Sequence, residues 1–335
     1  MLSAAKHLAQ QAEILRRKQM RPRMTIRVFL AVLAWVIGGI GASCVPAVAS
    51  LPPGHESLRV LDGAHVPDDP LEGRASVNRS GSAPDLVREK GPPRTMDAAI
   101  ERRIVYGWSV EGRPLVAYRL GDGPVARALV GGIHGGYEWN TTALMSKTLE
   151  YFASRRDQIP PELTLYVVPL ANPDGAAAGT DRVHGRMNAN RVDLNRNWDY
   201  QWQMTATHGT WPVFAGAHPF SEPETTALRE FILDRQIDAT VFYHSAAGEV
   251  YSGAGAEASQ TVALAKWLAQ QTGYRYAPEG IPGQITTGNS IDWLTHQGIT
   301  AVEVELSTHE TLDWEINLRG LRAFLYWNLP EMALD

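Results

Sequence analysis

Cysteine is almost absent from this chain. Its 335 residues include one cysteine, Cys44, which lies within the first 49 residues. The rest of the chain therefore holds no disulfide, and its stability must come from an apolar core and from any bound metal. With 44% hydrophobic and 20% charged residues, the composition is that of a globular protein rather than a disordered chain or a coiled coil.

An excess of positive charge is also missing. The whole chain has a formal net charge of −5. Residues 1–49 hold seven Lys or Arg and one Glu, so they account for +6 and leave residues 50–335 at −11. Binding a phosphate backbone requires clustered positive charge, so we expect no nucleic-acid partner.

The first 49 residues have the pattern of an export signal. Basic residues precede an apolar run over 28–40, and small residues follow up to Ala47-Val48-Ala49. This order is typical of a secretory signal peptide with its cleavage site. The alternative is an uncleaved membrane anchor, because residues 28–49 are nearly long enough to span a bilayer. We expect an exported protein, periplasmic or extracellular, that is membrane-anchored only if this leader is retained.

Residues 50–95 differ from both flanking regions. They are rich in Pro, Gly, Ser and Asp and show little apolar periodicity, which is typical of a linker or pro-segment. The folded domain is therefore expected over residues 96–335.

From residue 96 onward, strand patterns alternate with helical patterns. Alternating segments 104–110 and 114–120 flank Glu111-Gly112 and predict a hairpin. Further strands are expected over 128–133, 163–170, 239–243 and 299–306, and helices over 141–155, from 221 onward, and over 259–272, 290–296 and 313–329. This order predicts an α/β fold with a mixed central sheet and helices on both faces. Ligands of such sheets bind at the carboxyl ends of the strands.

The stretch from Asn172 to Asp199 stands out as a candidate wall of an active site. It is too polar for a core strand, and its Asn and Gly content disfavours a stable helix. Its Arg and Asn side chains suit recognition of a carboxylate.

Two predicted strands end at histidines. His134 follows the strand over 128–133, and Glu138 lies on the same Gly-rich turn. An imidazole and a carboxylate on one turn can bind one zinc ion, although an ordinary surface turn explains this pair equally well. His244 follows the strand over 239–243, where a hydrogen-bonded structural histidine is the simpler interpretation.

Two acids lie on one predicted strand. Glu303 and Glu305 share a face because side chains alternate along a strand, and Val304 points to the other face. Burying two carboxylates is costly, so the pattern predicts a nearby cation or a shared proton.

Several short motifs follow one another in a recognisable order. They are His134…Glu138-Trp139, Asn172-Pro-Asp-Gly175, Arg186, Asp193-Leu-Asn-Arg-Asn-Trp198, His244-Ser245, Ser290-Ile-Asp-Trp293 and Glu305-Leu306. Over about residues 100–330, the chain resembles zinc metallocarboxypeptidases of the carboxypeptidase A/B type, in the form of an exported bacterial-style member. The resemblance implies a zinc carboxypeptidase-like fold and hydrolysis of peptides at their C-termini.

The resemblance also implies a metal site and two catalytic residues. It assigns one zinc ion to His134, Glu138 and His244. It assigns the general base to Glu305 and stabilisation of the oxyanion to Arg186. These roles agree with the chemistry of zinc, which activates water and polarises carbonyl groups.

The substrate site is implied in the same way. Asn195 and Arg196 would bind the free terminal carboxylate of a peptide substrate, through a two-pronged hydrogen bond from the guanidinium and a third from the amide. Ile291 falls at the base of the side-chain pocket, which implies a preference for aliphatic or aromatic C-terminal residues. A shift of one residue would place Asp292 there and make the pocket acidic.

The chain departs from the family in two places. Three residues separate His134 from Glu138 where the family usually has two, and the two glycines among them can absorb the extra residue. The family's substrate-capping tyrosine has no counterpart near its expected place at Gln284. The candidates to replace it are Tyr251, Tyr274 and Tyr276.

Alternatives remain for the base and for the function. Glu303 competes with Glu305, which we prefer because Leu306 follows it as in the family. A murein-peptide amidase or another metal amidohydrolase could use the same scaffold. A peptide-binding protein without catalysis is a third interpretation. The sequence gives no indication of oligomeric state.

Overall fold

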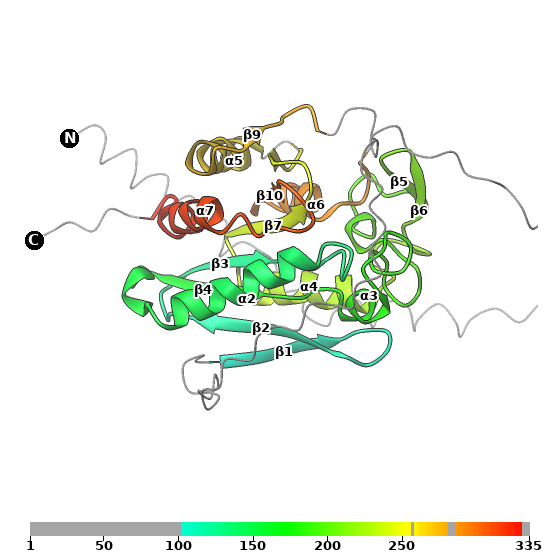
Figure 1. Cartoon of the computed structure of the whole chain (residues 1–335), viewed down its shortest axis with the longest axis horizontal. Coiled ribbons are helices and arrows are strands. Elements are labelled where there is room, and N and C mark those ends of the chain that lie inside the picture. Colours follow the sequence, from blue (N-terminus) through cyan, green and yellow to red (C-terminus); the bar gives the residue numbers. More distant parts are fainter. Residues whose placement is uncertain (1–101, 256–257, 281–285, 330–335) are drawn as a thin grey trace, which may run out of the picture. The chain divides into compact units, whose positions relative to one another are not determined.

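An eight-stranded mixed sheet forms the centre of the computed structural model, which describes residues 102–255, 258–280 and 286–329 (Figure 1). The strand order is β1-β2-β4-β3-β7-β10-β8-β9. The strands are β1 (Arg102–Trp108), β2 (Pro114–Leu120), β3 (Val125–Val130), β4 (Leu163–Val168), β7 (Ala239–Ser245), β8 (Glu249–Ser252), β9 (Arg275–Tyr276) and β10 (Thr300–Leu306). The expected leader and linker, residues 1–49 and 50–95, lie outside the described residues.

The middle of the sheet is parallel. Strand β3 pairs in parallel with β4 and β7, and β7 pairs in parallel with β10. Strands β2 and β8 run antiparallel to this group on either side. The carboxyl ends of β4, β3, β7 and β10 therefore meet at one edge of the sheet.

Helices cover both faces of the sheet. They are α2 (Trp139–Ala153), α3 (Pro173–Ala178), α4 (Pro223–Asp234), α5 (Ala258–Thr272), α6 (Ser290–His296) and α7 (Trp314–Tyr326). Helices α2, α5 and α7 contribute to one hydrophobic cluster, and α4 and α6 contribute to the cluster on the other face. In Figure 1, α2 lies in front of the strands and α4 behind them. The predicted mixed α/β fold is confirmed.

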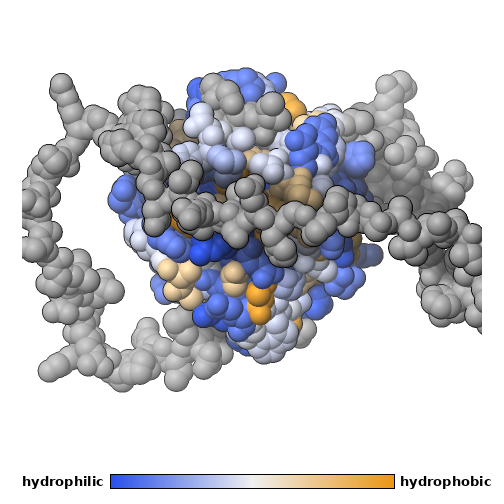
Figure 2. Space-filling view, turned by 90° about the vertical axis from the view of Figure 1, so that its right-hand side faces the viewer, coloured by the Kyte–Doolittle hydropathy of each residue, from blue (hydrophilic) through white to orange (hydrophobic). Residues whose placement is uncertain are grey.

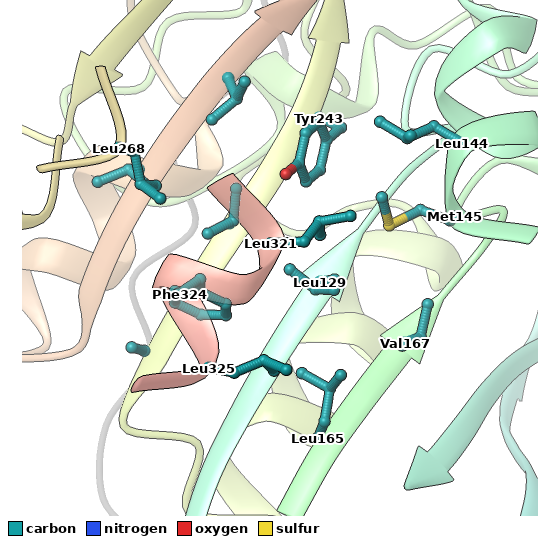
Figure 3. Close-up of a cluster of buried hydrophobic side chains, with 14 of the residues drawn as sticks. Leu129, Leu144, Met145, Leu165, Val167, Tyr243, Leu268, Leu321, Phe324 and Leu325 are labelled. Atoms are coloured by element: carbon teal, nitrogen blue, oxygen red, sulfur yellow. The ribbon is translucent and has the colours of Figure 1, made fainter. Parts of the chain in front are cut away.

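The cluster under α2, α5 and α7 is the larger one. Figure 3 shows Leu144 of α2, Leu268 of α5 and Phe324 of α7 converging on side chains of the central strands. Burying one such side chain contributes about 1.5–3 kcal/mol to the free energy of unfolding. This layer holds the sheet, and with it the strand ends, in a fixed arrangement.

Strand β10 uses its two faces differently. Val302, Val304 and Leu306 belong to the cluster under α2, α5 and α7, whereas Ala301 belongs to the cluster under α4 and α6. The intervening side chains of Glu303 and Glu305 therefore share the face of Ala301. The prediction that Val304 points away from both acids is confirmed.

The segment from Asn172 to Asp199 contains helical turns that the sequence did not predict. Helix α3 forms there because the Asn172 side chain accepts a hydrogen bond from Gly175 N (2.9 Å) and Pro173 occupies the first turn. A single 3-10 turn covers Leu194–Arg196. The Asn and Gly content was expected to disfavour a stable helix, yet the cap from Asn172 allows this six-residue helix to form.

A two-stranded ribbon was also not predicted. It consists of β5 (Thr205–His208) and β6 (Trp211–Phe214). Figure 2 views the molecule from the side where these strands lie in Figure 1, and the visible described surface is mostly hydrophilic with scattered hydrophobic residues. Trp211 and Phe214 of β6 are among the partly exposed hydrophobic residues of the chain. Trp198, by contrast, is fully buried against Phe242 and Trp293.

Among the helices in the described ranges, none combines the length and hydrophobicity needed to cross a bilayer. The leader for which an anchor was considered is not among those ranges.

Candidate metal and substrate site

The turn after β3 brings His134 and Glu138 together. Gly132 and Gly135 have positive φ angles of 62° and 49°, and a Cβ on Gly135 would lie within 2.7 Å of neighbouring backbone atoms. Only glycine fits there without strain. The resulting turn places His134 Nδ1 2.7 Å from Glu138 Oε1. The longer spacer between the two residues therefore still lets both side chains reach one point.

His244 meets this pair from β7. Its Nδ1 atom lies 3.2 Å from His134 Nδ1 and 3.1 Å from Glu138 Oε2. All three side chains are buried, and one ligand atom from each lies within 4.8 Å of the others. The structure thus brings the three predicted zinc ligands together, although residues 134 and 244 lie 110 positions apart.

The hydrogen-bond partners of the two rings fit a cation at this point. His134 Nε2 lies 3.2 Å from Asp193 Oδ1, and His244 Nε2 lies 3.4 Å from Glu303 Oε2. With a metal bound at Nδ1, each ring would carry its proton on Nε2 and donate it to the carboxylate there. Two such nitrogens and the carboxylate of Glu138 form a donor set that zinc commonly uses.

The charges around the two histidine rings also favour a bound cation. Burial opposes the charge of Glu138, but the His134 and His244 rings outweigh it and hold the pKa of this carboxyl well below its usual range. Burial lowers the pKa of His244, but Glu303 and Glu138 raise it to about 9. Burial and the charges of Glu138 and Glu303 raise the pKa of Glu305 well above its usual range. Among the described residues, Glu305 Oε2 is buried without a hydrogen-bond partner. This excess of carboxylates favours a bound cation.

Arg186 lies beside the three candidate ligands. Its Nε donates to Asp193 Oδ2 (2.9 Å), while one terminal nitrogen lies 3.2 Å from His134 Nδ1 and 3.4 Å from Glu138 Oε1. Burial lowers the pKa of the guanidinium, but Asp193 and Glu138 outweigh it and raise the value. Arg186 is therefore a fixed positive charge at the place where the resemblance puts the oxyanion.

Asp193 has a position that the sequence reasoning missed. It accepts hydrogen bonds from Arg186 Nε and from Asn195 N, and it faces His134 Nε2. Burial opposes its charge, but Arg186 and His134 hold its pKa well below the usual range. The available signal was its place two positions before Asn195, the first of the residues proposed to bind a carboxylate.

Asn195 is held in a defined orientation. Its Oδ1 accepts hydrogen bonds from the backbone N and the Oγ of Ser290, both at 3.0 Å. The amide nitrogen is therefore directed toward His244 Nε2 (3.5 Å) and Glu303 Oε2 (3.4 Å). The first turn of α6 thus positions a donor next to the candidate metal ligands.

Arg196 follows on the same 3-10 turn and is also buried. Its Nε and one terminal nitrogen donate to Thr207 O (3.1 and 3.0 Å), and the other terminal nitrogen donates to Asn195 O (2.8 Å). These bonds fix the plane of the guanidinium and leave further N–H groups for a ligand. Asn195 and Arg196, the two residues predicted to bind the substrate carboxylate, therefore lie side by side. Their role in binding stays a prediction.

Ile291 and Asp292 are neighbours in the first turn of α6. Ile291 is buried and belongs to the hydrophobic cluster under α4 and α6. Asp292 accepts hydrogen bonds from Ala254 N and Asn289 Nδ2, both at 2.6 Å. The assignment of Ile291 to the substrate pocket stays a prediction.

The three tyrosines considered as replacements for the capping tyrosine have other partners. The hydroxyl groups of Tyr251 and Tyr274 donate hydrogen bonds to the carboxylates of Glu249 and Asp313, the latter at 2.7 Å. The hydroxyl groups of Tyr276 and Ser252 are hydrogen-bonded to each other at 3.2 Å. The expected place at Gln284 lies outside the described residues.

Tyr137 is a phenol close to the charges of Arg186 and Glu138, and the sequence did not single it out. It lies in the spacer between His134 and Glu138, and its ring centroid is 4.7 Å from that of His309 and 5.9 Å from that of His208. Burial raises the pKa of Tyr137, and the charge of Arg186 opposes this rise. Its position within the unusual spacer was the only sequence signal.

Comparison with protein families identifies a relationship over most of the described chain. Residues 95–324 match the family of zinc carboxypeptidases, Peptidase_M14. Carboxypeptidase B of Astacus astacus is 30% identical over 159 residues, which cover 42% of this chain and 52% of that protein. Murein peptide amidase A of Escherichia coli K12 is 31% identical over 176 residues, covering 49% of this chain and 65% of that protein. Several of the curated relatives, among them zinc carboxypeptidase A 1 of Anopheles gambiae, are matched over only about half of their length.

Solved structures show the same relationship at the level of the fold. The murein-tripeptide amidase of Escherichia coli O157 superimposes with a TM-score of 0.52 and 25% identity, covering 69% of this chain and 94% of that one. Bovine thrombin-activatable fibrinolysis inhibitor, solved in complex with tick carboxypeptidase inhibitor, gives a TM-score of 0.57 at 19% identity, covering 67% and 86%.

Proposed function

Because this chain belongs to the zinc carboxypeptidase family, we propose that it is a zinc-dependent metallopeptidase that hydrolyses C-terminal residues from peptides. The observation that carries the proposal is the convergence of His134, Glu138 and His244 next to the buried Arg186. These three side chains would hold one zinc ion.

The residues around that point can divide the work of hydrolysis. Bound zinc supplies a Lewis acid that lowers the pKa of water and polarises a carbonyl group. Glu305 would accept the proton of the attacking water and deliver it to the leaving amine. Arg186 would stabilise the negative charge that develops on the carbonyl oxygen. Asp193 would keep Arg186 and His134 oriented, since it contacts both.

The terminal carboxylate of the substrate would bind to Asn195 and Arg196. Both side chains are held by bonds to Ser290 and Thr207, so little conformational entropy is lost when a ligand binds. A free C-terminus would thereby be selected over an internal peptide bond.

A pair of peptides tests this proposal. One ends in a free carboxylate and the other, of the same sequence, in an amide, and the release of the last residue is followed by mass spectrometry. Charged hydrogen bonds contribute about 1.5–3 kcal/mol each, so we expect the free acid to be cleaved about 100-fold faster or more. Equal cleavage of both peptides, or cleavage of neither by the zinc-loaded protein, would contradict the proposal.

A murein-peptide amidase is the second candidate. What favours it is the match to the Escherichia coli O157 amidase, of which 94% is covered. Incubation with a murein tripeptide, beside the free-acid peptide above, separates the two functions. Cleavage of the murein tripeptide alone would replace the carboxypeptidase proposal with this one.

We also propose that residues 1–49 direct export of the chain, as their basic, apolar and small-residue segments indicate. N-terminal sequencing of protein from an expressing cell tests this. A mature chain that begins at Ser50 is expected, whereas a membrane-bound chain with its leader intact would support the anchor instead.

A further inference from the structure

Glu303 is an acid of the site to which the proposed mechanism assigns no role. Its Oε2 atom lies 3.4 Å from His244 Nε2 and 3.4 Å from Asn195 Nδ2. It therefore lies between a candidate metal ligand and a candidate substrate-binding residue. Its side chain is 14% exposed, whereas those of Glu138 and His244 are at most 3% exposed. A group of the substrate can reach Glu303 more easily than it can reach those two.

The negative charge of Glu303 has little compensation. Among the residues that the structure describes, Glu303 forms no ion pair with a Lys or Arg. Arg196 is close enough for its charge to interact with Glu303 without forming an ion pair, and the cationic contact is His244, which becomes a neutral ligand when it binds a metal through Nδ1. The nearby Glu249, on the adjacent strand β8, differs in this respect because Arg275 is its partner.

A second acid adds to this charge. Asp292 lies in the first turn of α6, and burial together with the charge of Glu303 raises its pKa, while Arg196 lowers it. The positive charge of Arg196 is in turn shared with Asp193. The place where a terminal carboxylate would bind is therefore flanked by more negative than positive side chains.

A ligand that brought only a carboxylate to Asn195 would be repelled by Glu303. A ligand that also carries a cationic amine or guanidinium would satisfy both groups. We infer that Glu303 determines specificity and selects substrates whose C-terminal residue has a cationic side chain, such as Lys or Arg. This inference rests on the proposed carboxypeptidase function, and it replaces the apolar preference that Ile291 alone suggests.

The simpler alternative is that Glu303 only orients His244. The two roles differ in what they predict for a change of substrate. An orienting carboxylate affects every substrate equally and changes zinc affinity, whereas a specificity residue changes the ratio between substrates.

Two matched peptides that end in Lys and in norleucine test the inference, since norleucine has the same four-carbon side chain without the terminal ammonium group. With the zinc-loaded full chain, we expect kcat/KM to favour Lys by about 10-fold or more. In Glu303→Gln, the Lys-to-norleucine ratio should fall about 10- to 100-fold, which is the range for loss of one charged hydrogen bond. Glu230→Gln removes an exposed acid of α4 that pairs with Arg229, and it should leave the ratio unchanged.

The results of this experiment distinguish failure of the inference about Glu303 from failure of the proposed carboxypeptidase function. A wild-type preference for norleucine, or an unchanged ratio in Glu303→Gln, overturns the inference while the proposed function stands. Loss of zinc from Glu303→Gln, with the ratio of the remaining activity unchanged, assigns Glu303 to orienting His244 and also overturns it. Hydrolysis of neither peptide by the wild type contradicts the proposed function itself, and the inference falls with it.

Inhibition by free amino acids gives a second measurement that does not require a fully active variant. L-lysine should inhibit the wild type about 10-fold more strongly than L-norleucine, and Glu303→Gln should remove this difference. Equal inhibition of the wild type by both amino acids would overturn the inference.

Discussion

At the scale of single residues, the site depends on carboxylates that orient other groups. Asp193 contacts His134, Arg186 and the backbone of Asn195 at the same time. It joins the proposed metal ligands to the proposed oxyanion and substrate residues. Removing its charge should therefore disturb several functions together.

We expect Asp193→Asn to weaken zinc binding about 10- to 100-fold, because a zinc-bound His134 would donate its Nε2 proton to this carboxylate. Competition with a chromophoric chelator measures the zinc Kd. Asp181→Asn is a matched control, since Asp181 also contacts a histidine, His184, but both are exposed. Equal zinc affinity in the wild type and Asp193→Asn would show that Asp193 does not orient the ligand.

Glu305 should be needed for hydrolysis and not for metal binding. We expect Glu305→Gln to lower kcat by at least about 100-fold, which is the usual contribution of a general base. Zinc content, measured by elemental analysis, should stay at the wild-type level. Full activity of this variant would move the base to Glu303 or elsewhere.

At the scale of secondary-structure elements, α3 is tied to the β1–β2 hairpin through Asp174. Asp174 accepts hydrogen bonds from Ser109 Oγ (2.6 Å), Glu111 N (3.0 Å) and Arg113 (2.6 Å). Burial raises the pKa of this carboxyl, but the three donors outweigh it and lower the value. The charged form of Asp174 therefore favours the folded state.

This shift predicts how stability depends on pH. The folded pKa lies below the unfolded value of about 3.9, so the contribution is complete above that pH and is lost as the pH falls through the folded pKa. We expect Asp174→Asn to lower the free energy of unfolding by about 1–3 kcal/mol at pH 7, and by much less near pH 3. Urea denaturation at both pH values measures this. An equal difference at both would contradict the account.

The sequence predicted some of the helices and strands and missed others. The central strands and long helices were predicted because their apolar periodicity extends over many residues. Helix α3, the β5–β6 ribbon and the strands β8 and β9 were missed because each is too short, two to six residues, to show a periodic pattern. Bonds to particular side chains or neighbouring strands hold them instead, such as the Asn172 cap of α3.

For the site, motif order was enough to select His134, Glu138, His244 and Arg186, which the structure brings together. The contacts of Tyr137 with His208 and His309 could not be predicted in this way. They join residues that are more than 70 positions apart, and no local pattern encodes them.

At the scale of the whole molecule, α7 closes the larger hydrophobic cluster over the sheet. Phe324 is 1% exposed there, whereas Tyr326, two residues further along the same helix, is 59% exposed. We expect Phe324→Ala to lower the free energy of unfolding by about 3–5 kcal/mol and Tyr326→Ala by less than about 0.5 kcal/mol. Thermal and urea unfolding measure both. Similar values for the two variants would contradict this assignment of the core.

This chain belongs to a family of zinc enzymes, and we propose that His134, Glu138 and His244 hold its metal. The most direct test is the zinc content per chain, by elemental analysis, of the wild type and of Glu138→Ala. We predict one equivalent in the wild type and a loss of zinc in the variant, because the variant lacks one of three protein ligands. If neither protein holds zinc after reconstitution, the metallopeptidase account is wrong, and a peptide-binding scaffold explains the fold better.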